Sequence, residues 1–287
     1  MASEIRIDAL LPQEMARQAE SVGVRKVQAP PLTTFSLAVL AGAFIALGAV
    51  FATTVATGTS QAWPYGVARL LSGMAFCLGL ILVVVGGAEL FTGNNLIVMA
   101  WASRKVRTLQ LLRNWAIVYL GNFVGALGTA AMVFLSRQHT MASGTLGMTA
   151  LGTALAKVQL GFVQAVALGV VCNILVCLAV WLSFSARSSI DRIAAILFPI
   201  TAFVAGGFEH SVANMYFVPI GLAIKAFDPA YVLGTGMDLS GLTWSSFLLR
   251  NLLPVTLGNI LGGSIFVAAV YWSIFLRLPR PSGDPPG

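Results

Sequence analysis

Four stretches of more than 20 residues contain no Asp, Glu, Lys or Arg, and this feature limits the fold more than any other: 27–68, 114–136, 158–186 and 251–276. Each is longer than the roughly 20 residues that a membrane-spanning helix needs. Only 9% of the 287 residues are charged, against about 25% in soluble domains. The chain is therefore predicted to lie in a lipid bilayer, with four spans in these stretches.

Two further apolar stretches, 70–103 and 193–224, are too long for one straight span. At about 1.5 Å per residue, an unbroken helix over either would overshoot the hydrocarbon core of about 30 Å. Each is predicted to be an interrupted helix. All six stretches are apolar on every face, unlike the alternating strands of a membrane barrel. We therefore expect an all-α membrane protein with six transmembrane helices, the second and fifth interrupted. The uncharged, weakly apolar segment 138–156 is either a seventh span or a loop, and its glycine, serine and threonine content favours a loop.

Basic residues are distributed unequally between the two sides that six spans define. Twelve lie in the amino-terminal arm, around 104–113, at 187 and 192, and at 277 and 280, whereas five lie on the other side. The positive-inside rule then places both termini in the cytoplasm, which for a bacterial-type chain means the inner membrane. The net charge of +7 orients the protein and does not indicate nucleic-acid binding, because the cations flank spans.

In the amino-terminal arm, residues 1–31, we predict no cleaved signal peptide, because no apolar segment with a cleavage site is recognised ahead of the first span. Apolar residues recur in it at helical spacing, which favours a short amphipathic helix on the membrane surface over a frayed tail. These residues are Ile5, Leu10, Leu11, Met15, Ala19 and Val22.

Two sequence motifs occur once in each half of the chain. The pattern GGxExxxxN is found at 86–94 and 206–214, inside the two overlong stretches. LLRN followed six residues later by LGN occurs at 111–122 and 248–259. Because each half holds three spans, the second copy enters the bilayer from the opposite side, which predicts an inverted 3+3 repeat. We expect repeats at about 32–137 and 157–277, a channel domain over 32–277, and a short cytoplasmic tail at 278–287.

Segments in this repeat resemble the formate/nitrite transporter family over nearly the whole chain. The segments are GGAELFTGNN (86–95), GGFEHSVANMYFVPIGL (206–222), VALGVVCNILVCLAVW (166–181) and TLGNILGG (256–263). The resemblance implies an aquaporin-like protomer, a homopentamer with one pore per protomer, and passage of small monovalent anions.

The same resemblance implies which residues form the pore. Thr92 lies in the first interruption and His210 opposite it in the second, with Glu209, Lys157, Asn173 and Asn259 at supporting polar positions. Apolar constrictions correspond to two sets, Phe76, Leu80 and Phe203 at one level and Leu90, Phe91 and Val176 at another.

The chemistry of each polar position leaves two interpretations open. His210 either exchanges a proton with an entering weak-acid anion or only donates a hydrogen bond to it. Thr92 either contacts the anion or caps the freed backbone amides. Lys157 either attracts anions or snorkels at a span end. Asn173 and Asn259 either line the path or join helices.

Glu89 and Glu209 are the carboxylates that fall within the predicted spans, and we expect each to accept hydrogen bonds from backbone amides at its interruption. One carboxylate per half makes a poor metal site, and Cys77, Cys172 and Cys177 lie at no metal-binding spacing. No cofactor, metal or enzymatic activity is predicted.

The leading function is formate conduction, with nitrite or hydrosulfide as alternatives in the same pore. The FTGNN segment is closer to formate-type members of the family. An aquaporin-type channel for neutral solutes is a further alternative, but the chain contains no Asn-Pro-Ala motif.

Overall fold

The computed structural model describes residues 9–277, apart from the side chains of Ser60 and Gln61. Every regular element in this range is helical, which confirms the all-α prediction. Five helices are long and apolar enough to cross a membrane, and the pair α10–α11, bent by 103°, raises the number to six if it is counted as one span. The five are α2 (Pro31–Ala56), α4 (Tyr65–Gly86), α6 (Thr108–Leu135), α8 (Phe162–Ser185) and the continuous run Ser246–Arg277.

Shorter helices complete the fold. The run Ser246–Arg277 alternates between wide π-helical turns and α-helical turns: η3 (Ser246–Leu252), α12 (Leu253–Ile260), η4 (Leu261–Ala269), α13 (Val270–Trp272) and η5 (Ser273–Arg277). The other elements are α1 (Pro12–Gln28), α3 (Thr59–Ala62), η1 (Gly93–Ile97), α5 (Val98–Ala102), η2 (Gln138–Thr140), α7 (Thr145–Val158), α9 (Ser189–Ala205), α10 (Ser211–Phe227) and α11 (Pro229–Thr235).

Glycines let two helix pairs approach closely, α2 with α6 and α8 with the last run. A Cβ atom on Gly125 of α6 would lie 1.9 Å from the carbonyl oxygen of Val39. A Cβ atom on Gly262 of η4 would lie 2.3 Å from the carbonyl oxygen of Val170. Small residues at such crossings allow the backbones to touch, as in many membrane helix pairs.

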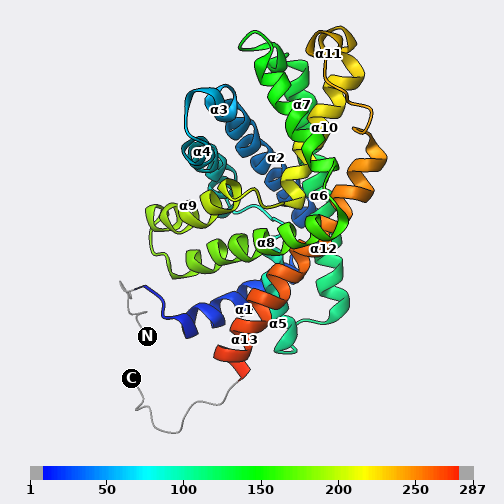
Figure 1. The fold of residues 1–287 in the computed structure, drawn as a ribbon. Coiled ribbons are helices and arrows are strands. Elements are labelled where there is room, and N and C mark those ends of the chain that lie inside the picture. Colours follow the sequence, from blue (N-terminus) through cyan, green and yellow to red (C-terminus); the bar gives the residue numbers. More distant parts are fainter. Residues whose placement is uncertain (1–8, 278–287) are drawn as a thin grey trace.

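The segment expected to be a loop at 138–156 is largely helical, so that prediction was wrong. Residues 145–158 form α7, and its buried Leu146, Ala150, Leu151 and Ala154 follow helical spacing. Packing against α10 therefore outweighs the glycine and threonine content that suggested a loop. Figure 1 shows α7 at the end of the molecule that also carries α11.

Helix α1 lies at the other end of the molecule, where it packs against α5 and η5 (Figure 1). It includes Met15, Ala19 and Val22 of the predicted amphipathic pattern, whereas Ile5 falls outside the described residues. Met15 and Ala19 are buried in a cluster with Ile97 and Met99 of η1 and α5. The apolar face of α1 is thus covered by protein. The predicted tail at 278–287 lies outside the described residues.

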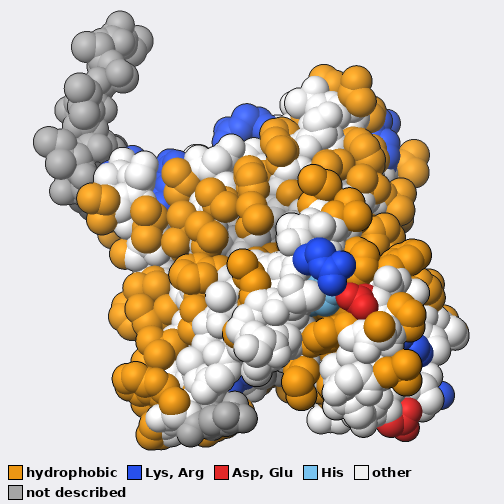
Figure 2. All heavy atoms as spheres, turned by 90° about the horizontal axis from the view of Figure 1, so that it is seen from above, with side chains coloured by type: hydrophobic (Ala, Val, Ile, Leu, Met, Phe, Trp, Pro, Cys, Tyr) orange, Lys and Arg blue, Asp and Glu red, His pale blue; other side chains and the backbone are white. Residues whose placement is uncertain are grey.

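The outer surface of the molecule is strongly apolar. Large exposed side chains include Leu120 and Met132 of α6, Val163 of α8 and Phe198 of α9. Figure 2 shows hydrophobic side chains over most of one face, with charged side chains confined to a few places. Such a surface requires lipid or protein neighbours, and with the apolar helices it identifies an integral membrane protein.

Candidate functional site

Two cavities lie against the chain segments that follow α4 and α9. The first, here named the α1 vestibule, has a volume of about 400 Å³ and is lined by α1, α4, the segment 87–94 and the end of α8. The second, the α7 vestibule, has a volume of about 360 Å³ and is lined by α2, α4, α7 and the segment 203–217. Since α1 and α7 lie at opposite ends of the molecule (Figure 1), the two cavities approach its middle from opposite sides.

Each of these segments has a left-handed glycine within its first two residues. Helix α4 stops at Gly86 and Gly87 has φ +77°, whereas α9 stops at Ala205 and Gly207 has φ +73°. Glycine adopts this conformation without the penalty that other residues carry. In both segments the amide of the following glutamate donates to a neighbouring helix, Glu89 to the Leu37 carbonyl at 3.2 Å and Glu209 to the Leu168 carbonyl at 3.3 Å.

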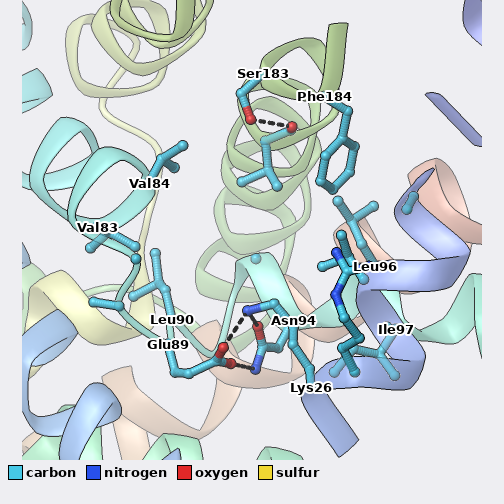
Figure 3. A pocket seen from close by; sticks show the side chains of 18 of the residues that line it. Lys26, Val83, Val84, Glu89, Leu90, Asn94, Leu96, Ile97, Ser183 and Phe184 are labelled. Carbon is cyan, nitrogen blue, oxygen red and sulfur yellow. Dashed lines mark hydrogen bonds and ion pairs between the residues drawn. The ribbon is translucent and has the colours of Figure 1, made fainter. Parts of the chain in front are cut away.

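A charged and amide cluster holds the first segment in the α1 vestibule. Lys26 Nζ donates to Glu89 Oε1 at 2.8 Å, and Asn94 Nδ2 donates to Glu89 Oε2 at 2.7 Å. Asn94 also donates to Asn114 Oδ1 at 2.9 Å. Figure 3 shows Lys26, Glu89 and Asn94 converging below Leu90. A partly buried carboxylate is thereby paired and hydrogen-bonded.

A second cluster holds the other segment with the same pattern of contacts. Lys157 Nζ donates to Glu209 Oε1 at 2.8 Å, Asn214 Nδ2 donates to Glu209 Oε2 at 2.7 Å, and Asn214 donates to Asn251 Oδ1 at 2.7 Å. Glu89 and Glu209 therefore accept from lysine and asparagine side chains, and not from backbone amides as the sequence suggested. Lys157 is ion-paired and only 13% exposed, so its charge is balanced locally.

Asn259 and Asn173 join segments of backbone. Asn259 donates to the carbonyls of Gly169 at 2.8 Å and Glu209 at 2.9 Å, and its Oδ1 accepts from the Ser211 amide at 2.9 Å. Asn173 Nδ2 donates to the Asn259 carbonyl at 2.7 Å and to Asn95 Oδ1 at 2.8 Å. Both side chains are fully buried and satisfied. This geometry matches helix joining, the second of the two roles that the sequence left open.

Thr92 and His210 meet between the two segments. The distance from Thr92 Oγ1 to His210 Nε2 is 2.9 Å, and both residues are buried. His210 caps α10, because its Nδ1 accepts the Ala213 amide at 3.0 Å. The ring proton then lies on Nε2, which points to Thr92. The Thr92 hydroxyl makes no cap bond to η1. The pair is thus a hydroxyl facing an imidazole N–H donor.

Apolar side chains surround this pair on both sides. Leu80 and Leu90 line the α1 vestibule, whereas Phe76, Phe203 and His210 line the α7 vestibule. The Phe203 ring packs edge-on against the Phe76 ring, with 5.3 Å between the ring centroids. It also stacks on the His210 ring, with 5.9 Å between the centroids.

The apolar residues divide differently from the two predicted sets. Leu80 shares a vestibule with Leu90 and not with Phe76. The Phe91 ring packs on Tyr119 of α6 at 4.9 Å, and neither Phe91 nor Val176 lines a vestibule.

Several residues of the two clusters were not named as site residues from the sequence. Lys26 lies in the arm that was treated separately, and Asn94, Asn114, Asn214 and Asn251 were visible only as letters of the repeated motifs. Their recurrence at matched positions was the available signal. Within residues 9–277, no three His, Cys, Asp or Glu side chains converge as a metal site would require.

Comparison with known proteins identifies the family of this chain. The family model described as formate/nitrite transporter matches residues 13–273. "Formate channel FocA" of Escherichia coli (strain K12) is 46% identical over 281 residues, covering 96% of this chain and 98% of the relative. "Probable formate transporter" of Methanothermobacter thermautotrophicus is 40% identical, covering 93% of this chain and 97% of that protein.

Solved structures show the same similarity. One titled "Pentameric formate channel with formate bound" is 46% identical, with a TM-score of 0.80 over 86% of this chain and 98% of the solved chain. An "FNT family ion channel" is 26% identical, with a TM-score of 0.77 over 91% of this chain and 98% of that one. The chain belongs to the formate/nitrite transporter family.

Proposed function

We propose that this protein conducts small monovalent anions, formate foremost, across a membrane through a path in each protomer. The observation that carries the proposal is the Thr92–His210 pair, which lies between two vestibules that approach it from opposite sides. Relatives at 46% and 40% identity bear the names of a formate channel and a probable formate transporter. Nitrite and hydrosulfide are the alternative anions for the same path.

The path must replace the hydrogen bonds to water that an anion loses when it leaves solution. Moving a bare carboxylate past apolar rings such as Phe76 and Phe203 costs several kcal/mol. The hydroxyl hydrogen of Thr92 can donate to an anion beside these apolar rings, and the Nε2–H of His210 becomes available when the anion replaces Thr92 as its acceptor. These neutral donors stabilise an anion less strongly than a fixed cation, which suits release on the far side.

His210 acts in this proposal as a hydrogen-bond donor, and proton exchange remains the alternative. The Ala213 amide on Nδ1 supports the donor role, because a doubly protonated ring must give up that bond. The exchange role requires formate to leave as formic acid and the ring to regain its proton from the other side. Proton movement per formate distinguishes the two.

We further propose that the fold is an inverted repeat in which α1 corresponds to α7. The supporting observation is that five polar side chains recur with the same contacts in both halves. The earlier boundaries, 32–137 and 157–277, then widen to include α1 and α7. The corresponding pairs are Lys26 and Lys157, Glu89 and Glu209, Asn94 and Asn214, Asn114 and Asn251, and Asn122 and Asn259.

The proposed assembly is a homopentamer in a bacterial-type inner membrane with both termini in the cytoplasm. The exposed apolar side chains on α6, α8 and α9 support contacts with lipid or other protomers. The basic residues on the α1 side support its cytoplasmic location. The α1 vestibule would then open to the cytoplasm and the α7 vestibule to the outside.

The experiment is formate flux into liposomes that contain the purified protein, with a pH indicator inside. We expect saturable formate entry, competition by nitrite and hydrosulfide, and strong loss of flux in His210→Asn, which keeps a good cap for α10. Anion-independent swelling without formate flux would instead indicate a neutral-solute channel. If His210→Asn still carries formate with unchanged proton movement, proton exchange at this residue is excluded.

A further inference from the structure

Arg69, near the start of α4, lies in the α7 vestibule and has an unusual set of partners. Its Nε donates to the Ala205 carbonyl at 3.2 Å, and its Nη2 donates to the Val204 carbonyl. These are the last carbonyls of α9, the helix that stops just before the second segment. The guanidinium also lies over Gly207, where an added Cβ atom would be 3.6 Å from Nη2.

The carboxyl end of a helix is a poor surface for an anion. Its last four carbonyls lack partners within the helix, and the helix dipole gives this end a partial negative charge. Two of those carbonyls in α9 are occupied by Arg69. In the corresponding place at the end of α4, Gly87 has open space around it, and no described side chain donates to Val84 or Val85. The two vestibules therefore differ at this point.

The charge of Arg69 is not balanced locally. Lys157 and Glu209, which line the same vestibule, pair with each other at 2.8 Å. Among the described residues no carboxylate lies within salt-bridge distance of Arg69. His210 is occupied by Thr92 and the Ala213 amide. Arg69 is thus the uncompensated cation among the residues that line the α7 vestibule.

The geometry points to Arg69 as the residue that receives anions in the α7 vestibule, a role that rests on the proposed anion conduction. A guanidinium has five N–H donors, and two of them are fixed on backbone carbonyls. Three remain for a ligand. Because the two anchored bonds already restrict the side chain, little rotamer freedom is left to lose when an anion binds. A planar carboxylate such as formate can accept two parallel hydrogen bonds from the free N–H groups of the guanidinium.

The test compares formate flux in wild type, Arg69→Gln and Arg69→Lys, with the half-saturating concentration measured at low and high salt. Glutamine can still donate to the α9 carbonyls but carries no charge, whereas lysine keeps the charge. We expect Arg69→Gln to raise the half-saturating concentration about three- to tenfold at low salt and to weaken its salt dependence, as loss of an attracting charge predicts. Arg69→Lys should recover most of the difference.

The matched control is Arg137→Gln, which removes the same charge from an arginine that is 71% exposed and does not line either vestibule. It should leave the half-saturating concentration unchanged. The inference is overturned if wild type conducts formate and Arg69→Gln keeps its half-saturating concentration and salt dependence, whatever happens to thermal stability. Absence of formate flux in wild type would instead count against the proposed function itself.

Discussion

The Thr92 hydroxyl lies 2.9 Å from His210 Nε2, and this contact joins the segment after α4 to the start of α10. The two residues are 118 positions apart in the chain. Their meeting depends on both polar clusters, because Glu89 and Glu209 fix the backbone only a few residues away on each side. The pair is therefore placed by the rigid surroundings and not by its own hydrogen bond alone.

Replacing Thr92 with valine removes the hydroxyl and keeps the shape. We expect formate flux to fall about tenfold, because a neutral hydrogen bond contributes about 1–1.5 kcal/mol and the His210 N–H also loses its acceptor. The measurement is initial formate flux in liposomes at matched protein content. Thr201→Val is the control, since Thr201 is a buried threonine of α9 that lines neither vestibule. Wild-type flux in Thr92→Val would contradict the assigned role.

The sequence predicted the helical class, and the family resemblance implied that His210 lies opposite Thr92, but neither predicted the contacts that hold the two segments. Spans are readable because lipid demands long uncharged helices. Lys26 was assigned to a surface arm, since its ion pair with Glu89 bridges 63 positions and leaves no local pattern. The prediction of a loop at 138–156 was wrong for a similar reason. Helix α7 is stabilised by its packing against α10, which is distant in the sequence, and not by its own composition.

Removing one carboxylate from either cluster should destabilise the protein. Glu209→Gln leaves Lys157 as an unpaired charge that is 13% exposed, and breaking a buried pair typically costs about 3–5 kcal/mol. Glu89→Gln should cost less, because Lys26 is 25% exposed and reaches water more easily. The measurement is the thermal midpoint in detergent for both variants.

A double variant tests whether the loss of stability comes from the unpaired lysine. Lys157→Met combined with Glu209→Gln should recover part of the lost stability, since no buried charge is then left unpaired. Equal midpoints for wild type and Glu209→Gln would show that the ion pair does not stabilise the segment after α9. A larger loss in Glu89→Gln than in Glu209→Gln would contradict the ranking by exposure.

The stability that the start of α9 contributes should fall in acid as Asp191 becomes protonated. Its carboxylate accepts the amides of Ser188 at 2.9 Å and Arg187 at 3.1 Å, which hold the pKa of Asp191 below its ordinary value of 3.8. A lowered pKa in the folded state means that the stabilisation is complete above the ordinary value and is lost as the pH falls through the folded value. Thermal midpoints between pH 6 and pH 3 should therefore decline less steeply in Asp191→Asn than in wild type. Parallel curves would rule out this capping contribution.

Alanine in place of glycine at the α2–α6 or α8–η4 crossing should destabilise the folded protein. A Cβ atom at Gly125 would lie 1.9 Å from the Val39 carbonyl oxygen and one at Gly262 would lie 2.3 Å from that of Val170. Backbone cannot yield as a flexible side chain does, so each helix pair must separate, which we expect to cost about 1–3 kcal/mol or more. Gly128→Ala is the matched control, because an added Cβ there meets nothing within 4 Å.

Expression yield and thermal midpoint check this prediction directly. Asn122 and Asn259 lie in the same two crossings and bond the Glu89 and Glu209 carbonyls at 2.9 Å each. Separation of either crossing therefore moves the segment after α4 or the segment after α9, and formate flux in Gly125→Ala and Gly262→Ala should fall further than the loss of folded protein explains. If both variants keep the wild-type midpoint and flux, close backbone contact does not position the Thr92–His210 pair.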